Sequence, residues 1–300
     1  MNYDGGTETR SYNAMFQLTG ISGLGQNITY NFPAGSNNGK IASQYDAVSG
    51  ETVSYQYDSL NRLISASAAG WSQSYSYDGF GNLTNRVGSG AAVGNNPTPA
   101  DPATNRLVNA AYDANGNMLS TGNVYDVENR LMQAAMAGGT IQYAYDGQNK
   151  RIWQGSFTNS GDPQMLMLET VSMFGADGQL AATYSTQPGF NNTTNPVGIT
   201  FAQVVQRVYF GRKLIKWVDA AYAAHNAVQD RLGSVGKYYP YGEERNSPPL
   251  ANDQVKFATY TRDAATGNDY ADQRYYGSTF GRFMSPDPYK DRRNAFFGET

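Results

Sequence analysis

Aromatic and polar residues alternate over short stretches of this chain, and each stretch ends in a cluster of turn-forming residues. Three pairs of tyrosines are spaced two residues apart: Tyr55 and Tyr57, Tyr75 and Tyr77, and Tyr143 and Tyr145. Side chains two apart share one face of a β-strand, so the two rings of a pair are expected to point the same way. An apolar residue follows four of the clusters, at Leu63, Leu83, Met118 and Leu131. The pattern predicts a repeated unit of strand, turn and returning strand.

Tyr-Asp dipeptides mark the expected turns. Their aspartates between residues 45 and 146 are Asp46, Asp58, Asp78, Asp113, Asp126 and Asp146. From the second onward, the third residue after the aspartate is Asn or Gly: Asn61, Gly81, Gly116, Asn129 and Asn149. Asn and Gly enter the left-handed backbone region at low cost, and an aspartate can accept backbone N–H groups at the start of a turn. Each copy is therefore expected to be an aspartate-capped turn with one residue at positive φ.

The repeats are nested. Asp46, Asp58 and Asp78 have counterparts 67 or 68 residues later. Fixed periods of this kind are typical of modular arrays, in which each unit stacks on its neighbours and does not fold well alone.

Composition favours strands and turns over helices. The 300 residues include 33 Gly and 23 Tyr, and only 16% are charged, which is typical of β-rich chains and argues against charge-driven disorder. The net charge of −3 and the lack of a basic stripe argue against a nucleic-acid partner. No apolar run approaches the roughly 18 residues needed for a membrane span.

The residue types also limit the chemistry. The chain has no cysteine, and His225 is its only histidine. Disulfides, thiolate nucleophiles, cysteine-held zinc and multi-histidine metal sites are therefore excluded. We expect no metal and no cofactor.

The C-terminal part carries a recognisable set of motifs. Residues 230–235 read Asp-Arg-Leu-Gly-Ser-Val, residues 239–243 read Tyr-Pro-Tyr-Gly-Glu, and residues 280–288 read Phe-Gly-Arg-Phe-Met-Ser-Pro-Asp-Pro. Together they resemble the RHS repeat-associated core. With the Tyr-Asp repeats upstream, the chain resembles RHS/YD-repeat proteins over about residues 40–290.

The resemblance implies an architecture and a function. RHS proteins wind strips of β-hairpins into a hollow shell, and the core segment plugs one end. The implied fold is all-β, a curved sheet or partial shell of repeated hairpins with a plug-like C-terminal segment. Bacterial members commonly enclose a C-terminal toxin that self-cleavage releases, whereas eukaryotic relatives are cell-surface adhesion proteins.

The resemblance also implies site residues. In the family, self-cleavage is attributed to an aspartate pair, and Asp287 matches its first member while Arg274 matches a supporting arginine. Family chains continue into an asparagine-rich segment with a second Asp-Pro-x-Gly motif, but this chain reads differently from Tyr289 to Thr300. We interpret Asp287 as a vestigial cleavage residue.

Four regions are expected along the chain. They are a YD-repeat hairpin array at residues 1–155, an irregular β segment with loops at 156–228, the RHS repeat-associated core at 229–290, and an atypical terminus at 291–300. Within the second region, residues 165–171 fit a buried strand or a short helix, and residues 220–227 are expected to form a helical turn.

The leading hypothesis is a non-enzymatic shell fragment of an RHS-type system that encapsulates or presents a C-terminal effector or toxin. Its partners would be that segment or a longer RHS protein, and it would be secreted or on the cell surface, an expectation taken from the family. The alternative is a cell-surface adhesion or carbohydrate-binding protein that uses the tyrosine pairs as a stacking surface. Cross-strand packing is the competing interpretation of the same pairs.

We predict that the chain does not cleave itself. Paired carboxylates work by sharing a proton, one as acid and one as base, and a single aspartate cannot fill both roles. The intact mass spectrum of the purified chain should show one full-length species. A processed product would contradict the prediction.

Overall fold

The fold is built from two large antiparallel sheets around a small third sheet. The computed structural model describes residues 2–3, 6–92, 94–119, 122–158, 166–190, 196–245 and 253–287. A two-stranded ribbon, β1 (Asn2–Tyr3) and β2 (Gly6–Thr7), precedes the first large sheet. The predicted all-β class is confirmed.

The N-terminal sheet has nine strands in chain order. They are β3 (Thr9–Tyr12), β4 (Leu18–Gly23), β5 (Gln26–Asn31), β6 (Ser43–Asp46), β7 (Glu51–Tyr57), β8 (Leu63–Ala68), β9 (Trp71–Tyr77), β10 (Leu83–Gly90) and β11 (Gly94–Pro97). Each strand pairs with the next, as the repeat of strand and turn predicts, and the connections are short except for the longer loop between β5 and β6.

The central sheet repeats this plan with longer strands. They are β12 (Val124–Tyr125), β13 (Leu131–Met136), β14 (Gly139–Tyr145), β15 (Arg151–Thr158), β16 (Leu166–Phe174), β17 (Leu180–Phe190), β18 (Pro196–Phe210), β19 (Lys213–Asp219) and β20 (Ala224–Asn226). The expected boundary after residue 155 lies inside β15, so the sheet continues through it.

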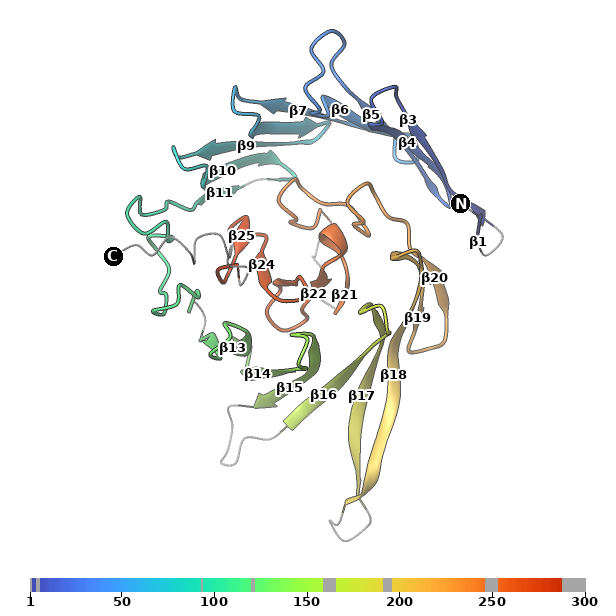
Figure 1. Cartoon of the computed structure of the whole chain (residues 1–300), viewed down its shortest axis with the longest axis vertical. Coiled ribbons are helices and arrows are strands. Elements are labelled where there is room, and N and C mark those ends of the chain that lie inside the picture. The colour runs from blue at the N-terminus through green and yellow to red at the C-terminus, as the bar shows by residue number, and fades with distance from the viewer. Residues whose placement is uncertain are drawn as a thin grey trace, which may run out of the picture.

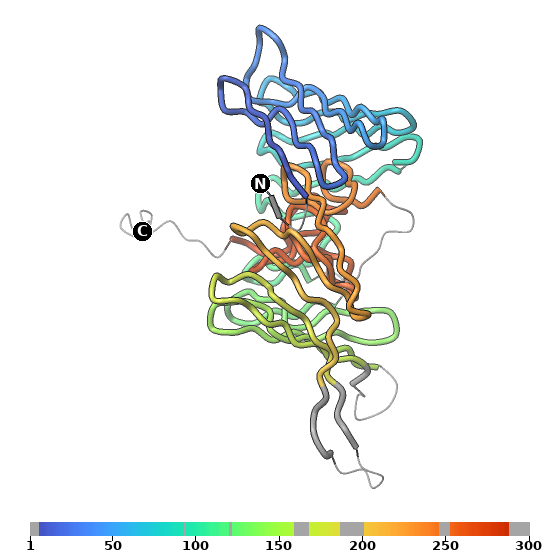
Figure 2. The backbone as a smooth tube through the Cα atoms, turned by 90° about the vertical axis from the view of Figure 1, so that its right-hand side faces the viewer, coloured from blue at the N-terminus to red at the C-terminus, as the bar shows by residue number. Residues whose placement is uncertain are grey.

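The core segment, residues 229–245 and 253–287, lies between the two large sheets. It contains β21 (Gln254–Val255), a 3-10 turn (Phe257–Thr259), β22 (Thr261–Arg262), β23 (Asp269–Tyr270), β24 (Tyr275–Gly277) and β25 (Arg282–Phe283). Figure 1 shows the two large sheets curving around it as the arcs of a ring. In the perpendicular view of Figure 2, the core segment again lies between them.

The Tyr-Asp turns share one geometry. In the copy at Asp58, Oδ1 accepts the backbone N–H groups of Leu60 at 3.0 Å and Arg62 at 2.8 Å. Asn61 has a φ of 62°. The other residues singled out at this position also have positive φ: Gly81 (89°), Gly116 (87°), Asn129 (63°) and Asn149 (63°). Asp78, Asp126 and Asp146 likewise accept the backbone N–H groups of the second and fourth residues after the aspartate. Asp113 accepts that of the fourth residue, Asn117.

Neighbouring turns are hydrogen-bonded to one another along one rim of the sheets. Arg62 Nη1 donates to the carbonyl oxygen of Asp78 at 3.0 Å. Asn82 Nδ2 donates to Asn105 Oδ1 at 2.6 Å. In the central sheet, Arg130 Nη1 donates to Asn149 Oδ1 at 2.9 Å. The turns therefore join successive repeats of the two large sheets as well as reversing the chain.

Two expectations for residues 156–228 are settled by the strands. Of the two interpretations of residues 165–171, the strand is correct, because β16 covers most of them. The helical turn expected at residues 220–227 is wrong. Asp219 Oδ1 accepts the N–H groups of Ala221 and Ala223, both at 2.9 Å, and Tyr222 has a φ of 64°. This is the aspartate-capped turn again, and it leads into β20.

Gly81→Ala should lower the free energy of unfolding by about 1–2 kcal/mol, because an L-residue is strained in the left-handed region. No atom lies within 4 Å of a Cβ built at Gly81, so the cost is conformational and not steric. Gly79→Ala is the matched control, since the same open space surrounds it and its φ is not positive. Denaturant unfolding measures both variants, and an equal effect would contradict the strain argument.

Candidate functional site

The two large sheets together form a wall around the core segment. The paired tyrosines lie on the face of this wall that meets the core segment. Tyr75 and Tyr143 are 4% and 1% exposed. The Tyr143 hydroxyl donates to Asp263 Oδ2 at 3.0 Å, and the Tyr75 ring lies 5.1 Å from that of Tyr241. Core residues therefore cover both rings, and Tyr75 and Tyr143 pack against the core segment.

The hydroxyl of the second tyrosine of each pair binds the backbone of the preceding repeat. The hydroxyls of Tyr57, Tyr77 and Tyr145 donate to the carbonyl oxygens of Ile41, Leu63 and Leu131 at 3.0, 2.6 and 2.7 Å. Tyr125 donates in the same way to the Met118 carbonyl oxygen at 3.1 Å. These bonds tie each repeat to the one before it. Tyr55 and Tyr57 also line a cavity.

Ion pairs and rings join the N-terminal sheet to the core segment. Trp71 meets Tyr239 edge-on with the ring centres 5.0 Å apart. Arg245 Nη1 donates to Glu51 Oε2 at 3.0 Å, and Arg86 Nη2 donates to Glu243 Oε1 at 2.5 Å. Burial alone would raise the pKa of Glu51, but hydrogen bonds from Arg245 and Trp71 and the charge of Arg245 lower it below the ordinary value.

Arg151 joins the central sheet to the core segment. Its side chain is buried, and Nη1 donates to Asp263 Oδ2 at 2.6 Å and to the Tyr275 hydroxyl at 2.7 Å. The guanidinium also lies 4.7 Å from the ring centre of Tyr270. Burial alone would lower the pKa of Arg151, but Tyr275 and the carboxylates of Asp263 and Asp253 raise it well above the ordinary value. Arg151 therefore stays charged inside the protein.

The two residues implied by the family resemblance meet at the end of the core segment. Arg274 Nη2 lies 3.1 Å from Asp287 Oδ2, and the guanidinium of Arg274 lies 3.8 Å above the ring centre of Phe283. The Asp287 side chain is 58% exposed. This carboxylate is therefore well solvated and paired with a cation. The cleavage role of these residues stays a prediction.

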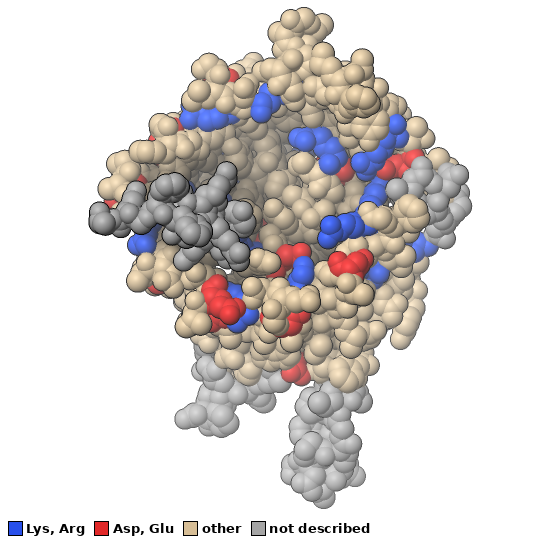
Figure 3. All heavy atoms as spheres, in the orientation of Figure 1, with Lys and Arg blue, Asp and Glu red and all other residues tan. Residues whose placement is uncertain are grey.

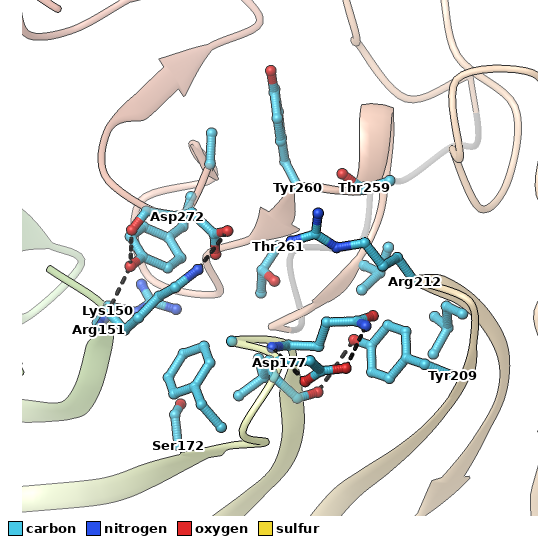
Figure 4. A pocket seen from close by; sticks show the side chains of 18 of the residues that line it. Lys150, Arg151, Ser172, Asp177, Tyr209, Arg212, Thr259, Tyr260, Thr261 and Asp272 are labelled. Carbon is cyan, nitrogen blue, oxygen red and sulfur yellow. Dashed lines mark hydrogen bonds and ion pairs between the residues drawn. The ribbon is translucent and has the colours of Figure 1, made fainter. Parts of the chain in front are cut away.

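A pocket with a volume of 450 Å³ lies between the central sheet and the core segment. Figure 4 shows Lys150 paired with Asp272, and the two side chains lie 2.7 Å apart. Gln179 Nε2 donates to Asp177 Oδ2 at 2.6 Å. Arg212 reaches into the pocket from the turn between β18 and β19. Both carboxylates are occupied by neighbouring donors, so the pocket does not present a free acid–base pair.

Two further observations bear on function. Within the ranges given above, no group of three or more His, Asp or Glu side chains is arranged to hold a metal ion. Among the same residues, no helix is long and apolar enough to cross a membrane.

Curved hairpin sheets closed on an internal core segment define the architecture of an RHS/YD-repeat shell protein, and the recognition made from the sequence motifs is confirmed. The model of the teneurin YD-shell family matches residues 2–161, which is more than half of the chain. The chain belongs to the teneurin YD-shell family.

Solved structures share this fold. The crystal structure of TcdB2-TccC3-TEV superimposes with a TM-score of 0.63 at 18% identity over 94% of this chain and 17% of that one. The crystal structures of TcdB2-TccC3 and TcdB2-TccC3-Cdc42 each give a TM-score of 0.60, also at 18% identity, over 95% of this chain. This chain spans 17% of the length of those chains. No curated protein matched it.

Arg151→Met should lower the free energy of unfolding by about 3–5 kcal/mol, because removing one partner leaves a buried carboxylate, Asp263, without its counter-charge. Lys237→Met is the control. Lys237 also joins the core segment to the wall, at 3.1 Å from Asp46, but it is 44% exposed, and its loss should cost less than about 1 kcal/mol. Thermal and denaturant unfolding measure both variants, and similar losses would contradict the importance assigned to burial.

Proposed function

We propose that the chain is a wall segment of an RHS-type shell that encapsulates or presents a C-terminal effector or toxin segment. Its family and fold give it a structural shell role. The observation that supports the finer proposal is the position of the core segment. Both large sheets curve around this segment and are fastened to it by Arg86 and Arg151. A segment held in this way fixes the place where the following residues begin.

The interior chemistry supports a structural role. Asp263 is bound by Arg151, Asp269 by Arg262 at 2.6 Å, and Glu243 by Arg86. Catalytic acids and bases need a proton that can move to a substrate, whereas these carboxylates are committed to ion pairs that join secondary-structure elements. We therefore propose that the chain contributes a shell and no catalytic activity, with Asp287 and Arg274 serving as a surface ion pair.

The partners and location follow from the same proposal. The chain would hold a C-terminal effector or toxin, or associate with a longer RHS protein whose wall it extends. The family resemblance supports an extracellular context, so we propose a secreted or cell-surface location.

The proposal is tested by attaching a short, unstructured, protease-sensitive peptide after Thr300 and timing its digestion. A segment held by the shell is cut only when it is released, so cleavage should be about tenfold or more slower than for the free peptide. The same peptide placed before Met1 is the control and should be cut at the rate of the free peptide. Equal rates at the two ends would contradict the proposal.

A further inference from the structure

The pocket between the central sheet and the core segment is large enough for a small molecule. Its volume of 450 Å³ lies within the range of about 300–1,000 Å³ that is typical of small-molecule sites. Its lining comes from β16 and β17, from the turn between β18 and β19, and from core-segment residues between 255 and 272. Distant parts of the chain thus enclose one space, and their side chains determine what can occupy it.

One part of the lining is apolar. Phe174 at the end of β16 and Leu180 at the start of β17 are cross-strand partners, and both line the pocket. Leu214 from β19 and Val255 from the core segment also line it. Apolar surface inside a cavity favours the burial of a hydrocarbon group. This part of the pocket therefore suits a ligand with an apolar body.

Arg212 places a cation at the pocket. Figure 4 shows its side chain extending toward Tyr260 and Thr261 of the core segment. Among the described residues, the guanidinium makes no ion pair and no hydrogen bond. The Asp177 carboxylate on the pocket wall accepts the backbone N–H of Gln179 at 3.1 Å and its side-chain amide at 2.6 Å. Hydrogen bonds from Gln179 lower the pKa of Asp177, and the charge of Arg212 is the smallest contribution. Arg212 is therefore available to an anion.

The backbone at Arg212 is in a costly conformation. Its φ is 67°, in the left-handed region, and Gly211 before it has a φ of 53°. Asn and Gly adopt this conformation at lower cost than other residues, and they occupy the positive-φ positions of the Tyr-Asp turns. A long charged side chain held at such a position supports a role for that side chain.

The other charges of the lining favour a ligand with a single negative charge. Lys150 is paired with Asp272 at 2.7 Å, and Arg151 is paired with Asp263 at 2.6 Å. In the lower half of Figure 3, where the central sheet lies, Lys and Arg side chains lie beside Asp and Glu side chains. A phosphate monoester would bring a second negative charge close to Asp177 and Asp272. A monocarboxylate avoids this repulsion.

We propose that this pocket binds a small monocarboxylic acid with an apolar body, an arylalkanoic acid in chemical class. Arg212 holds the carboxylate, and the hydrocarbon body lies against Phe174, Leu180 and Leu214. The Thr261 hydroxyl lines the same pocket and makes no hydrogen bond with the described residues, so it provides a second donor. A fully apolar compound of the same size would bury the guanidinium without a partner, which is unfavourable.

Isothermal titration of the full chain with 4-phenylbutyrate tests the proposal. The comparison ligands are 4-phenylbutan-1-ol, which lacks the charge, and phenyl phosphate, which carries a second one. Arg212→Gln removes the cation and keeps most of the side-chain length. Arg231→Gln is the matched control, because Arg231 is another exposed arginine and does not line this pocket. Thermal unfolding checks that every variant is folded.

4-Phenylbutyrate should bind saturably, and Arg212→Gln should weaken its binding by about ten- to a hundredfold, the effect of losing one charge-assisted hydrogen bond. Arg231→Gln should leave binding unchanged. The alcohol and phenyl phosphate should bind more weakly than the acid, and binding of the alcohol should be insensitive to Arg212→Gln. No saturable binding of the acid, equal binding by Arg212→Gln, or tighter binding of phenyl phosphate would overturn the proposal.

Arg212→Asn separates ligand binding from folding. Asn tolerates the left-handed backbone, so this variant should lose binding and unfold at the same temperature as the parent chain or a higher one. A lower unfolding temperature would mean that Arg212 is held for packing, and that result would overturn its assignment to a ligand.

Discussion

The structure depends on ion pairs that join the two large sheets to the core segment between them. Arg86 and Arg151 project from the concave face of the two large sheets and reach carboxylates of the core segment. Taking these charges out of water costs several kcal/mol per ion, and their attraction offsets that cost only when both partners are in place. Neither the wall nor the core segment would satisfy its charges alone. The hairpin array and the segment inside it therefore specify each other's position.

The local part of the fold could be predicted from the sequence because it is determined by residues close in the chain. An aspartate with Asn or Gly three residues later dictates the turn, and alternation sets the face of each tyrosine. The same rule was missed at Asp219 and Asp230, because no tyrosine precedes either aspartate and Tyr222 occupies the positive-φ position of the first. The geometry of the turn needs the aspartate and not the tyrosine.

The contacts between wall and core could not be predicted, because their partners lie more than a hundred residues apart. A weaker signal was nevertheless present. The fifth residue after the aspartate is apolar at Leu63, Leu83, Met118 and Leu131. At the same offset the chain has Glu51 and Arg151, and both are anchors for the core segment. A charged residue at a repeat position that is otherwise apolar thus marks a repeat whose side chain contacts the core segment.

The hydrogen-bonded turns along one rim couple the movements of neighbouring hairpins. Side chains such as Arg62, Arg130 and Asn82 connect one turn to the next, so moving one hairpin outward would require breaking its hydrogen bonds to the neighbouring turn. Between the two large sheets, residues 98–119 form the isolated bridges Ala100–Leu107 and Tyr112–Met118. Met118 N–H donates to the Met284 carbonyl oxygen there, and Pro286 lies against Gly116. Leu107, Met118 and Met284 also belong to one buried hydrophobic cluster, so the end of the core segment is anchored in the stretch of chain that joins the two large sheets.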